Sequence, residues 1–163
     1  MICRVGLAEQ QVIPVWPDTA PGSEAWAHHE IAFHERPLPA APPMIMFRDV
    51  VTPTLTVYPA AAAKRSGIAM IVCPGGGGET GGRQIPSDAP PLFAVVAEDD
   101  PMMAGKVVDL YLDWKAAKIP AELHVYAKGG HGFGTIKQGL PVEGWLDLLS
   151  DWVSGERSTI PHR

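Results

Sequence analysis

The stretch from residue 90 to residue 133 constrains the fold most, because strand-like and helical patterns alternate along it. Residues 93–97 are a short apolar run rich in β-forming side chains, and residues 122–126 are a second such run. Between them, residues 103–117 carry apolar side chains at helical spacing. A strand, a helix and a strand in this order are typical of a parallel sheet. We therefore predict an α/β fold with a mostly parallel sheet flanked by helices.

Polar, chemically capable residues follow both predicted strands. Asp99 and Asp100 come directly after the first strand, and His131 lies in a glycine-rich turn after the second. Because the carboxyl ends of parallel strands meet at one edge of a sheet, we expect an acid and the histidine to lie side by side there. An imidazole beside a carboxylate is the base and orienting acid of many hydrolases. We favour Asp100 as the orienting acid, with Asp99 as the alternative.

The acidic cluster itself allows other interpretations. Glu98, Asp99 and Asp100 are adjacent, so repulsion is expected to raise the pKa of at least one of them if they are buried. A solvated acidic turn before the next helix is the simpler alternative. Two carboxylates flanking a sugar would suit glycosidic hydrolysis, although neighbours on a strand point to opposite faces.

A glycine run offers a second candidate element of a site. Residues 68–73 are continuously apolar, which predicts a strand covered on both faces with Cys73 buried in it. Four successive glycines follow Pro74, namely Gly75, Gly76, Gly77 and Gly78. Their backbone N–H groups are able to approach a ligand closely, as an oxyanion hole or a phosphate nest. The phosphate interpretation is weaker, since no Gly-Lys-Ser/Thr and no Rossmann spacing follow. A flexible turn is the third alternative.

The chain is expected to form a single domain of 163 residues, with a proline-rich segment at 1–53 and an α/β core at 54–163. Residues 12–16 are predicted to form an edge strand, and residues 54–58 a strand that opens the core. Residues 23–35 are predicted to form a short helix capped by Ser23. His29 and His34 of that segment are five apart and lie on different helical faces, and Glu30 and His34 have the four-residue spacing but are only two ligands, so we expect no metal site.

Composition excludes several classes of protein. Hydrophobic residues make up 46% and charged residues 19%, which is typical of a globular chain. The net charge of −5 argues against nucleic-acid binding, and no apolar run is long enough to span a membrane. No charged-then-apolar leader is visible, so we expect a cytoplasmic protein with reduced cysteines. We expect no cofactor.

These pieces together resemble the α/β-hydrolase superfamily, and within it small carbohydrate-esterase-like members related to acetyl-xylan esterases. Residues 72–78 resemble the glycine-rich oxyanion loop, residues 93–101 the strand that delivers the triad acid, and residues 129–133 the loop that delivers the triad histidine. The resemblance implies a carboxylesterase-like hydrolase that acts on small or carbohydrate esters. It also implies that Gly75 to Gly78 stabilise the oxyanion.

The sequence departs from this superfamily by lacking the nucleophile. No Gly-x-Ser-x-Gly elbow is present, and only 14 residues separate Gly78 from Phe93, where the family places several strands and helices. Ser87 and Cys73 are candidate substitutes, and water activated by His131 is another. A catalytically inactive binding or scaffold remnant is the alternative from a different class.

The short central block also suggests an oligomer. A sheet that lacks its central strands has exposed edges, and exposed edges pair readily with a second chain. We therefore expect a homodimer in which sheet or helices are shared between the subunits. Exchange of elements between the two chains is one way to form it. A small ester or sugar is the expected ligand.

Overall fold

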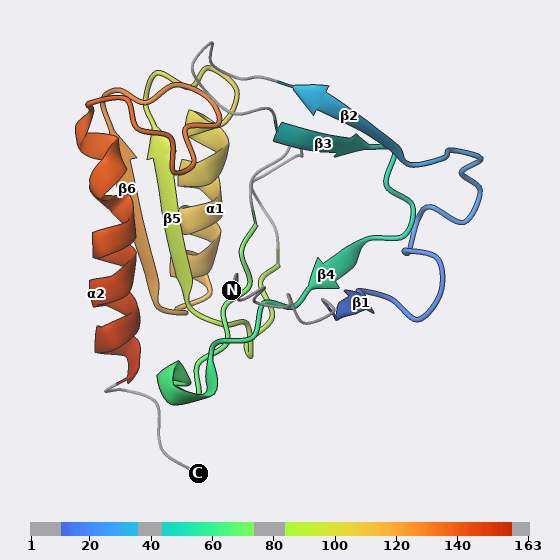
Figure 1. Cartoon of the computed structure of the whole chain (residues 1–163), viewed down its shortest axis with the longest axis horizontal. Coiled ribbons are helices and arrows are strands. Elements are labelled where there is room, and N and C mark those ends of the chain that lie inside the picture. The colour runs from blue at the N-terminus through green and yellow to red at the C-terminus, as the bar shows by residue number, and fades with distance from the viewer. Residues whose placement is uncertain (1–10, 36–43, 74–83, 158–163) are drawn as a thin grey trace, which may run out of the picture. The chain divides into compact units, whose positions relative to one another are not determined.

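The computed structural model describes residues 11–35, 44–73 and 84–157. The chain divides into two compact units, residues 1–69 and residues 70–163 (Figure 1). The described elements are three two-stranded sheets, two short 3-10 helices and two α-helices, which together make a small α/β-type fold. Among the described residues, neither α-helix is long and apolar enough to cross a membrane.

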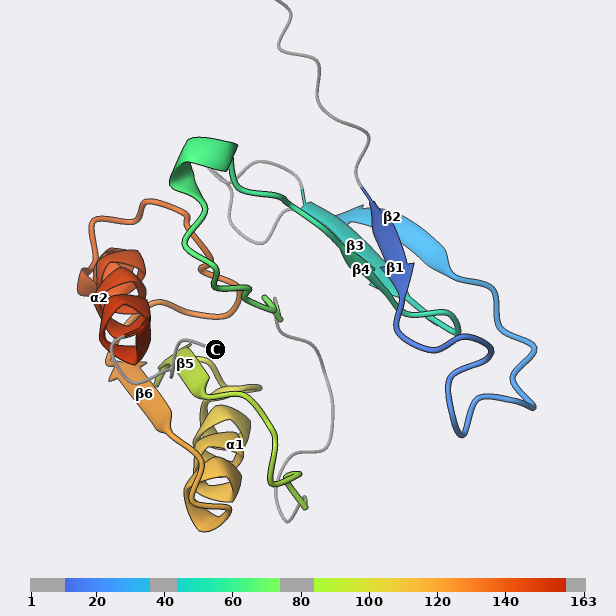
Figure 2. The same cartoon turned by 90° about the horizontal axis from the view of Figure 1, so that it is seen from below.

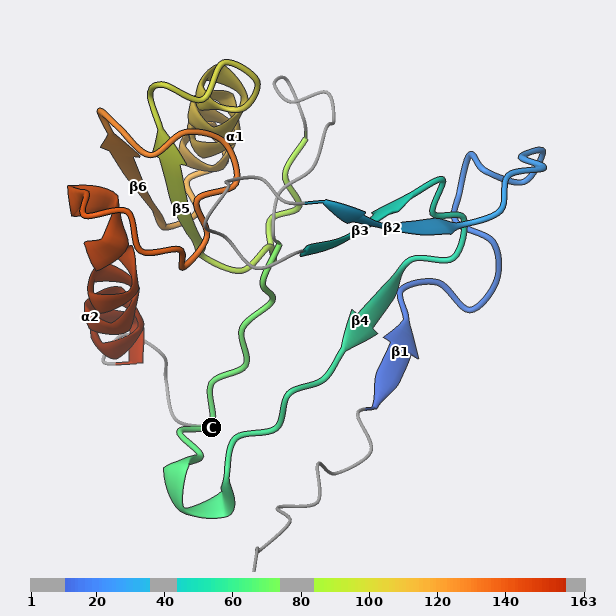
Figure 3. The same cartoon turned by 45° about the horizontal axis from the view of Figure 1, so that its top comes forward.

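The first unit contains two antiparallel strand pairs (Figure 3). Strand β1 (Val12–Pro14) pairs with β4 (Thr54–Thr56), and β2 (Ile31–Glu35) pairs with β3 (Met44–Arg48). The strands expected near residues 12–16 and 54–58 are thus present, although each is shorter than predicted. Because β4 pairs with β1, it belongs to the first unit and not to the unit that contains the parallel sheet.

The helix predicted over residues 23–35 is wrong. Ser23 lies in a turn in which its hydroxyl donates to the carbonyl of Ala20 at 2.6 Å, and the chain then enters β2. The alternation of Ile31 and Phe33 suits a strand, and Phe33 lies opposite Met46 of β3. Strand β3 was not expected, so the partner that decides the conformation of β2 was missing from the prediction.

The buried strand predicted over residues 68–73 is also wrong. After a single 3-10 turn, η1 (Ala62–Lys64), the chain has no regular structure up to Cys73, which is an exposed free thiol. The side chains of Ile71 and Val72 are 66% and 73% exposed. An apolar run becomes a buried strand only where other strands pair with it. None of the strands in the described ranges pairs with residues 68–73.

The second unit is the parallel βαβ arrangement predicted from the sequence. Strand β5 (Leu92–Ala97) leads into α1 (Ala104–Ala116), which returns to β6 (Ala121–Tyr126). The two strands are parallel, in a register that runs from Leu92 opposite Ala121 to Ala97 opposite Tyr126. The unit ends with η2 (Pro141–Gly144) and α2 (Trp145–Arg157).

The two helices of this unit cover opposite faces of the β5–β6 sheet (Figures 1 and 2). Helix α1 packs against both strands and α2 contacts β5. The α2 side is aromatic, since the Phe93 ring lies 5.5 Å from that of Trp152 and 5.3 Å from that of His124. The buried core is small. Among the described residues, its apolar members are Ala94, Val96 and Ala97 of β5 and Val142 of η2.

Candidate active site

The carboxyl edge of the β5–β6 sheet brings together two residues that are 31 positions apart in the sequence. The chain leaves β5 through Asp99 and Asp100, and it leaves β6 toward the turn that carries His131. Because the two strands are parallel neighbours, both exits lie at the same edge. His131 Nδ1 lies 2.9 Å from Asp100 Oδ2, within hydrogen-bonding distance.

Asp100 is held as a buried carboxylate. Its side chain is 6% exposed, and its Oδ1 atom accepts hydrogen bonds of 3.0 Å from the backbone N–H groups of Met102 and Met103. Burial alone would raise the pKa of Asp100, but the hydrogen bonds from His131 and from these two N–H groups outweigh it. The pKa of Asp100 is therefore lower than its ordinary value. The raised pKa expected for a buried member of the acidic cluster is not found at Asp100.

The ionised state of Asp100 fixes the hydrogen on the imidazole. A carboxylate only accepts hydrogen bonds, so the hydrogen between the two groups belongs to Nδ1 of His131. In neutral His131 the Nε2 atom then carries the lone pair and is the basic position. The side chain is 48% exposed, and no described residue makes a hydrogen bond or ion pair with Nε2. The geometry thus presents a base to solvent at the sheet edge.

Asp99 makes different contacts from Asp100. Its Oδ1 atom accepts hydrogen bonds from the backbone N–H groups of Gly129 and Gly130, at 3.0 and 2.8 Å. Its Oδ2 atom lies 3.7 Å from the amine of Lys128. Asp99 therefore contacts the backbone of the loop that carries His131, whereas Asp100 contacts the ring.

Ser87 lies away from this pair. It is an exposed turn residue, in a turn closed by a 3.0 Å hydrogen bond from Ala89 N–H to the carbonyl of Pro86. Three residues later, the carbonyl of Pro90 accepts a 2.9 Å hydrogen bond from the indole of Trp114 near the end of α1. That end of α1 lies at the amino edge of the sheet, opposite the edge that carries His131. Within the described part of the chain, no hydrogen bond joins Ser87 to His131.

The remaining candidates of the sequence are placed as follows. Gly75, Gly76, Gly77 and Gly78 lie outside the described residues, and Cys73 is exposed at the end of a described range.

Among the described residues, no group of three or more histidine, cysteine, aspartate or glutamate side chains is arranged to hold a metal ion. A second histidine–carboxylate pair exists, in which His124 Nε2 lies 2.6 Å from Glu122 Oε1 on β6.

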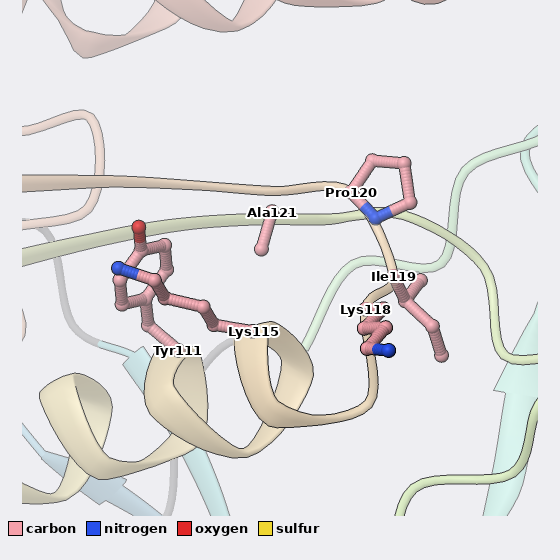
Figure 4. A pocket seen from close by; sticks show the side chains of 6 residues that line it. All are labelled: Tyr111, Lys115, Lys118, Ile119, Pro120 and Ala121. Atoms are coloured by element: carbon pink, nitrogen blue, oxygen red, sulfur yellow. The ribbon is translucent and has the colours of Figure 1, made fainter.

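A shallow hollow of about 320 Å³ lies at the amino edge of the sheet (Figure 4). Its lining includes Tyr111, Lys115 and Lys118. The two lysine side chains point in opposite directions in Figure 4, so their amines do not converge on one ligand position. The hollow is at the opposite end of the strands from His131 and does not form part of the same site.

Three residues that we did not predict as site residues fix the loop after His131. Glu143 accepts backbone hydrogen bonds from the end of this loop, Gln138 donates to the carbonyl of Gly129, and Trp145 donates to the carbonyl of Gly134. The sequence does contain a signal for Glu143. A proline followed two positions later by a glutamate is typical of the first turn of a helix, where the acid contacts free N–H groups.

Comparison of this chain with models of protein families, with curated proteins and with solved structures found no match. The class of site is therefore defined by its geometry. It is an exposed histidine, oriented by a buried and ionised carboxylate, at the carboxyl edge of a parallel βαβ unit.

Proposed function

We propose that this protein is a carboxylesterase-like hydrolase that acts on small or carbohydrate esters, within an α/β-hydrolase-like framework. The observation that carries the proposal is the 2.9 Å contact between His131 Nδ1 and the buried carboxylate of Asp100. In such a pair the carboxylate holds the imidazole in one tautomer and stabilises the imidazolium that forms during the reaction. Both groups lie at the edge where open α/β sheets place their sites.

The proposed reaction uses water as the nucleophile. His131 Nε2 removes a proton from a water molecule, and the oxygen of that water attacks the ester carbonyl carbon. The tetrahedral intermediate then expels the alkoxide, which takes the proton from Nε2 and leaves as an alcohol, while the acid is the second product. In this proposal the N–H groups of Gly75 to Gly78 stabilise the oxyanion, an assignment that rests on the sequence.

The expected rate is modest. General base catalysis by a positioned side chain contributes about 10²- to 10⁴-fold. Without an activated serine, this term and the oxyanion donors supply most of the acceleration. We therefore expect slow hydrolysis that depends strongly on both members of the pair.

The glycosidase alternative is weaker on the described geometry. A glycosidase needs a carboxylic acid that keeps its proton near neutral pH, which requires a raised pKa. The pKa of Asp100 is lowered, and both of its oxygens already have partners. Asp99 is occupied by the backbone of Gly129 and Gly130. The ester proposal, in contrast, keeps the hydrogen bonds that Asp99 and Asp100 make in the structure.

The test is hydrolysis of p-nitrophenyl acetate by the wild type and by the His131→Ala and Asp100→Asn variants. The chain offers a matched control, because His124 also pairs with a carboxylate and is a quarter exposed. Any imidazole attacks this ester slowly, so the His124→Ala variant measures that background. We expect a loss of about 10²-fold or more in kcat/KM for His131→Ala.

The expected ranking also includes a substantial loss for Asp100→Asn and little change for His124→Ala, with all variants folded by circular dichroism. Equal rates in the His131 and His124 variants, or no hydrolysis by the wild type, would contradict the enzymatic proposal. Either result would favour the alternative of an inactive binding or scaffold module.

A further inference from the structure

We propose that Asp99 and Glu143 are positioning residues that bind the two ends of the loop of residues 129–140 and thereby orient His131 toward its reaction partner. The inference rests on the proposed function for its catalytic meaning. The hydrogen bonds on which it is based all lie within residues 97–100 and 126–145.

The loop needs external support because its own sequence does not fix a conformation at His131. Gly130 and Gly132 flank the histidine, and both have φ near +69°. Glycine has no side chain to restrict the backbone, so this pair of neighbours allows many orientations of the residue between them. Packing does not restrict His131 either, since about half of its side chain is exposed. Hydrogen bonds to the surrounding loop must therefore set its direction.

Asp99 supplies these bonds before the histidine. A single carboxylate oxygen, Oδ1, receives the N–H groups of Gly129 and Gly130. Asp99 is adjacent in sequence to Asp100, which contacts the ring of His131. One short turn after β5 therefore determines both the backbone position and the ring position of the histidine.

Glu143 supplies the bonds after the histidine. Its Oε1 atom receives the backbone N–H groups of Gln138, Gly139 and Leu140, the last at 3.4 Å. Its side chain is 20% exposed. The N–H group of Gln138 is the main cause that places the pKa of Glu143 below its ordinary value. Glu143 is thus a charged acceptor for three consecutive N–H groups, and such bonds are stronger than neutral ones.

Gln138 joins the two ends. Its side-chain amide donates a 3.2 Å hydrogen bond to the carbonyl of Gly129, whose N–H group is bound to Asp99. Glu143 in turn holds the backbone of Gln138. The resulting circuit runs from Asp99 through Gly129 and Gln138 to Glu143. Removal of the Glu143 side chain is therefore expected to loosen the backbone just before His131.

The ion pair of Glu143 does not explain this role. Lys137 Nζ lies 3.5 Å from Glu143 Oε2, but the lysine side chain is largely exposed. Exposed ion pairs contribute little, typically below about 1 kcal/mol. The important atom is Oε1, and a glutamine carbonyl oxygen is able to take its place.

The experiment measures the tautomer of His131 by ¹⁵N NMR of the imidazole, at a pH where the ring is neutral. The wild type is expected to show the Nδ1–H tautomer required by Asp100. In Glu143→Ala we expect a shift toward the Nε2–H tautomer that free histidine prefers, with kcat/KM lower by roughly 10- to 100-fold. Glu143→Gln should restore most of both properties, and Lys137→Met should change neither.

The outcomes separate positioning from stability and from the proposed function. Loss of stability in Glu143→Ala with an unchanged His131 tautomer would overturn the proposal, because a purely structural residue behaves in that way. If that variant does not fold, Gln138→Ala removes only the link to Gly129 and receives the same test. A fixed tautomer in a wild type without esterase activity would contradict the enzymatic proposal while leaving the positioning role intact.

Discussion

Gly129 lies so close to Ala97 at the carboxyl edge of the parallel sheet that a side chain on Gly129 would not fit without a shift of the surrounding atoms. A Cβ atom added to Gly129 would lie 2.9 Å from the Cβ of Ala97 and 3.3 Å from the ring of Phe133. Ala97 is fully buried and its short side chain has no other rotamer to adopt. The histidine-bearing loop therefore approaches the end of β5 as closely as a glycine allows.

Gly129→Ala is accordingly expected to lower the free energy of unfolding by about 1–3 kcal/mol, the usual cost of added volume in a packed place. It should also lower esterase activity, because the shifted loop carries His131. Urea unfolding measures the first effect. Gly144→Ala is the control, since no atom outside its local backbone lies within 4 Å of the added Cβ. A variant Gly129→Ala as stable as Gly144→Ala would contradict the close contact.

Acid should destabilise the protein through Asp100 and Glu143. The pKa of each carboxyl is lower in the folded chain than its ordinary value. The unfolded chain therefore binds protons more readily, and stability rises with pH in this range. The contribution is complete above the ordinary values of about 3.9 and 4.3, and it is lost as the pH falls through the lower folded values.

Urea midpoints measured from pH 6 down to pH 3 test this expectation. The wild type should lose stability as the pH falls below about 4, and Asp100→Asn should show a shallower dependence. An unchanged slope in Asp100→Asn would show that its carboxyl is not stabilised by folding.

The identity of the nucleophile is tested by removing the two candidate side chains. Ser87 lies in an exposed turn shortly before Pro90, whose carbonyl is bound by Trp114 at the amino edge, and Cys73 is exposed. If water is the nucleophile, Ser87→Ala and Cys73→Ser should each keep the hydrolysis that depends on His131. Mass spectrometry after brief exposure to the ester should show no acetylated Ser87. Loss of activity in either variant would replace water with that residue in the mechanism.

We also propose that the protein is a homodimer in solution. The apolar side chains of Ile71 and Val72 are largely exposed, and the described sheets each have only two strands. Association would remove this apolar surface from water and pair free strand edges. Light scattering after size exclusion should give twice the mass of the chain, and Ile71→Ser should weaken the association. A strictly monomeric mass across the accessible concentrations would contradict the proposal.

The parallel unit was predictable because its patterns are local. The apolar run of β5, the helical stripe of α1 and the run of β6 each indicate their own structure, and parallel pairing then places Asp100 beside His131. The hairpin of β2 and β3 was not predictable in the same way. Its pairing partner was not recognised, and without it residues 31–35 were assigned to a helix.

The sequence by itself determined the order of strand, helix and strand in the second unit and the position of an acid and a histidine after the two strands. Only the tertiary structure decided which acid contacts the ring and which contacts the loop, because Asp99 and Asp100 are adjacent and chemically identical. It also decided which N–H groups Glu143 binds, because the proline–glutamate spacing indicates the start of a helix but not the contacts to Gln138 and Gly139 before it. Periodic patterns report the burial of repeated side chains, whereas single hydrogen bonds between a side chain and a distant backbone leave no such pattern.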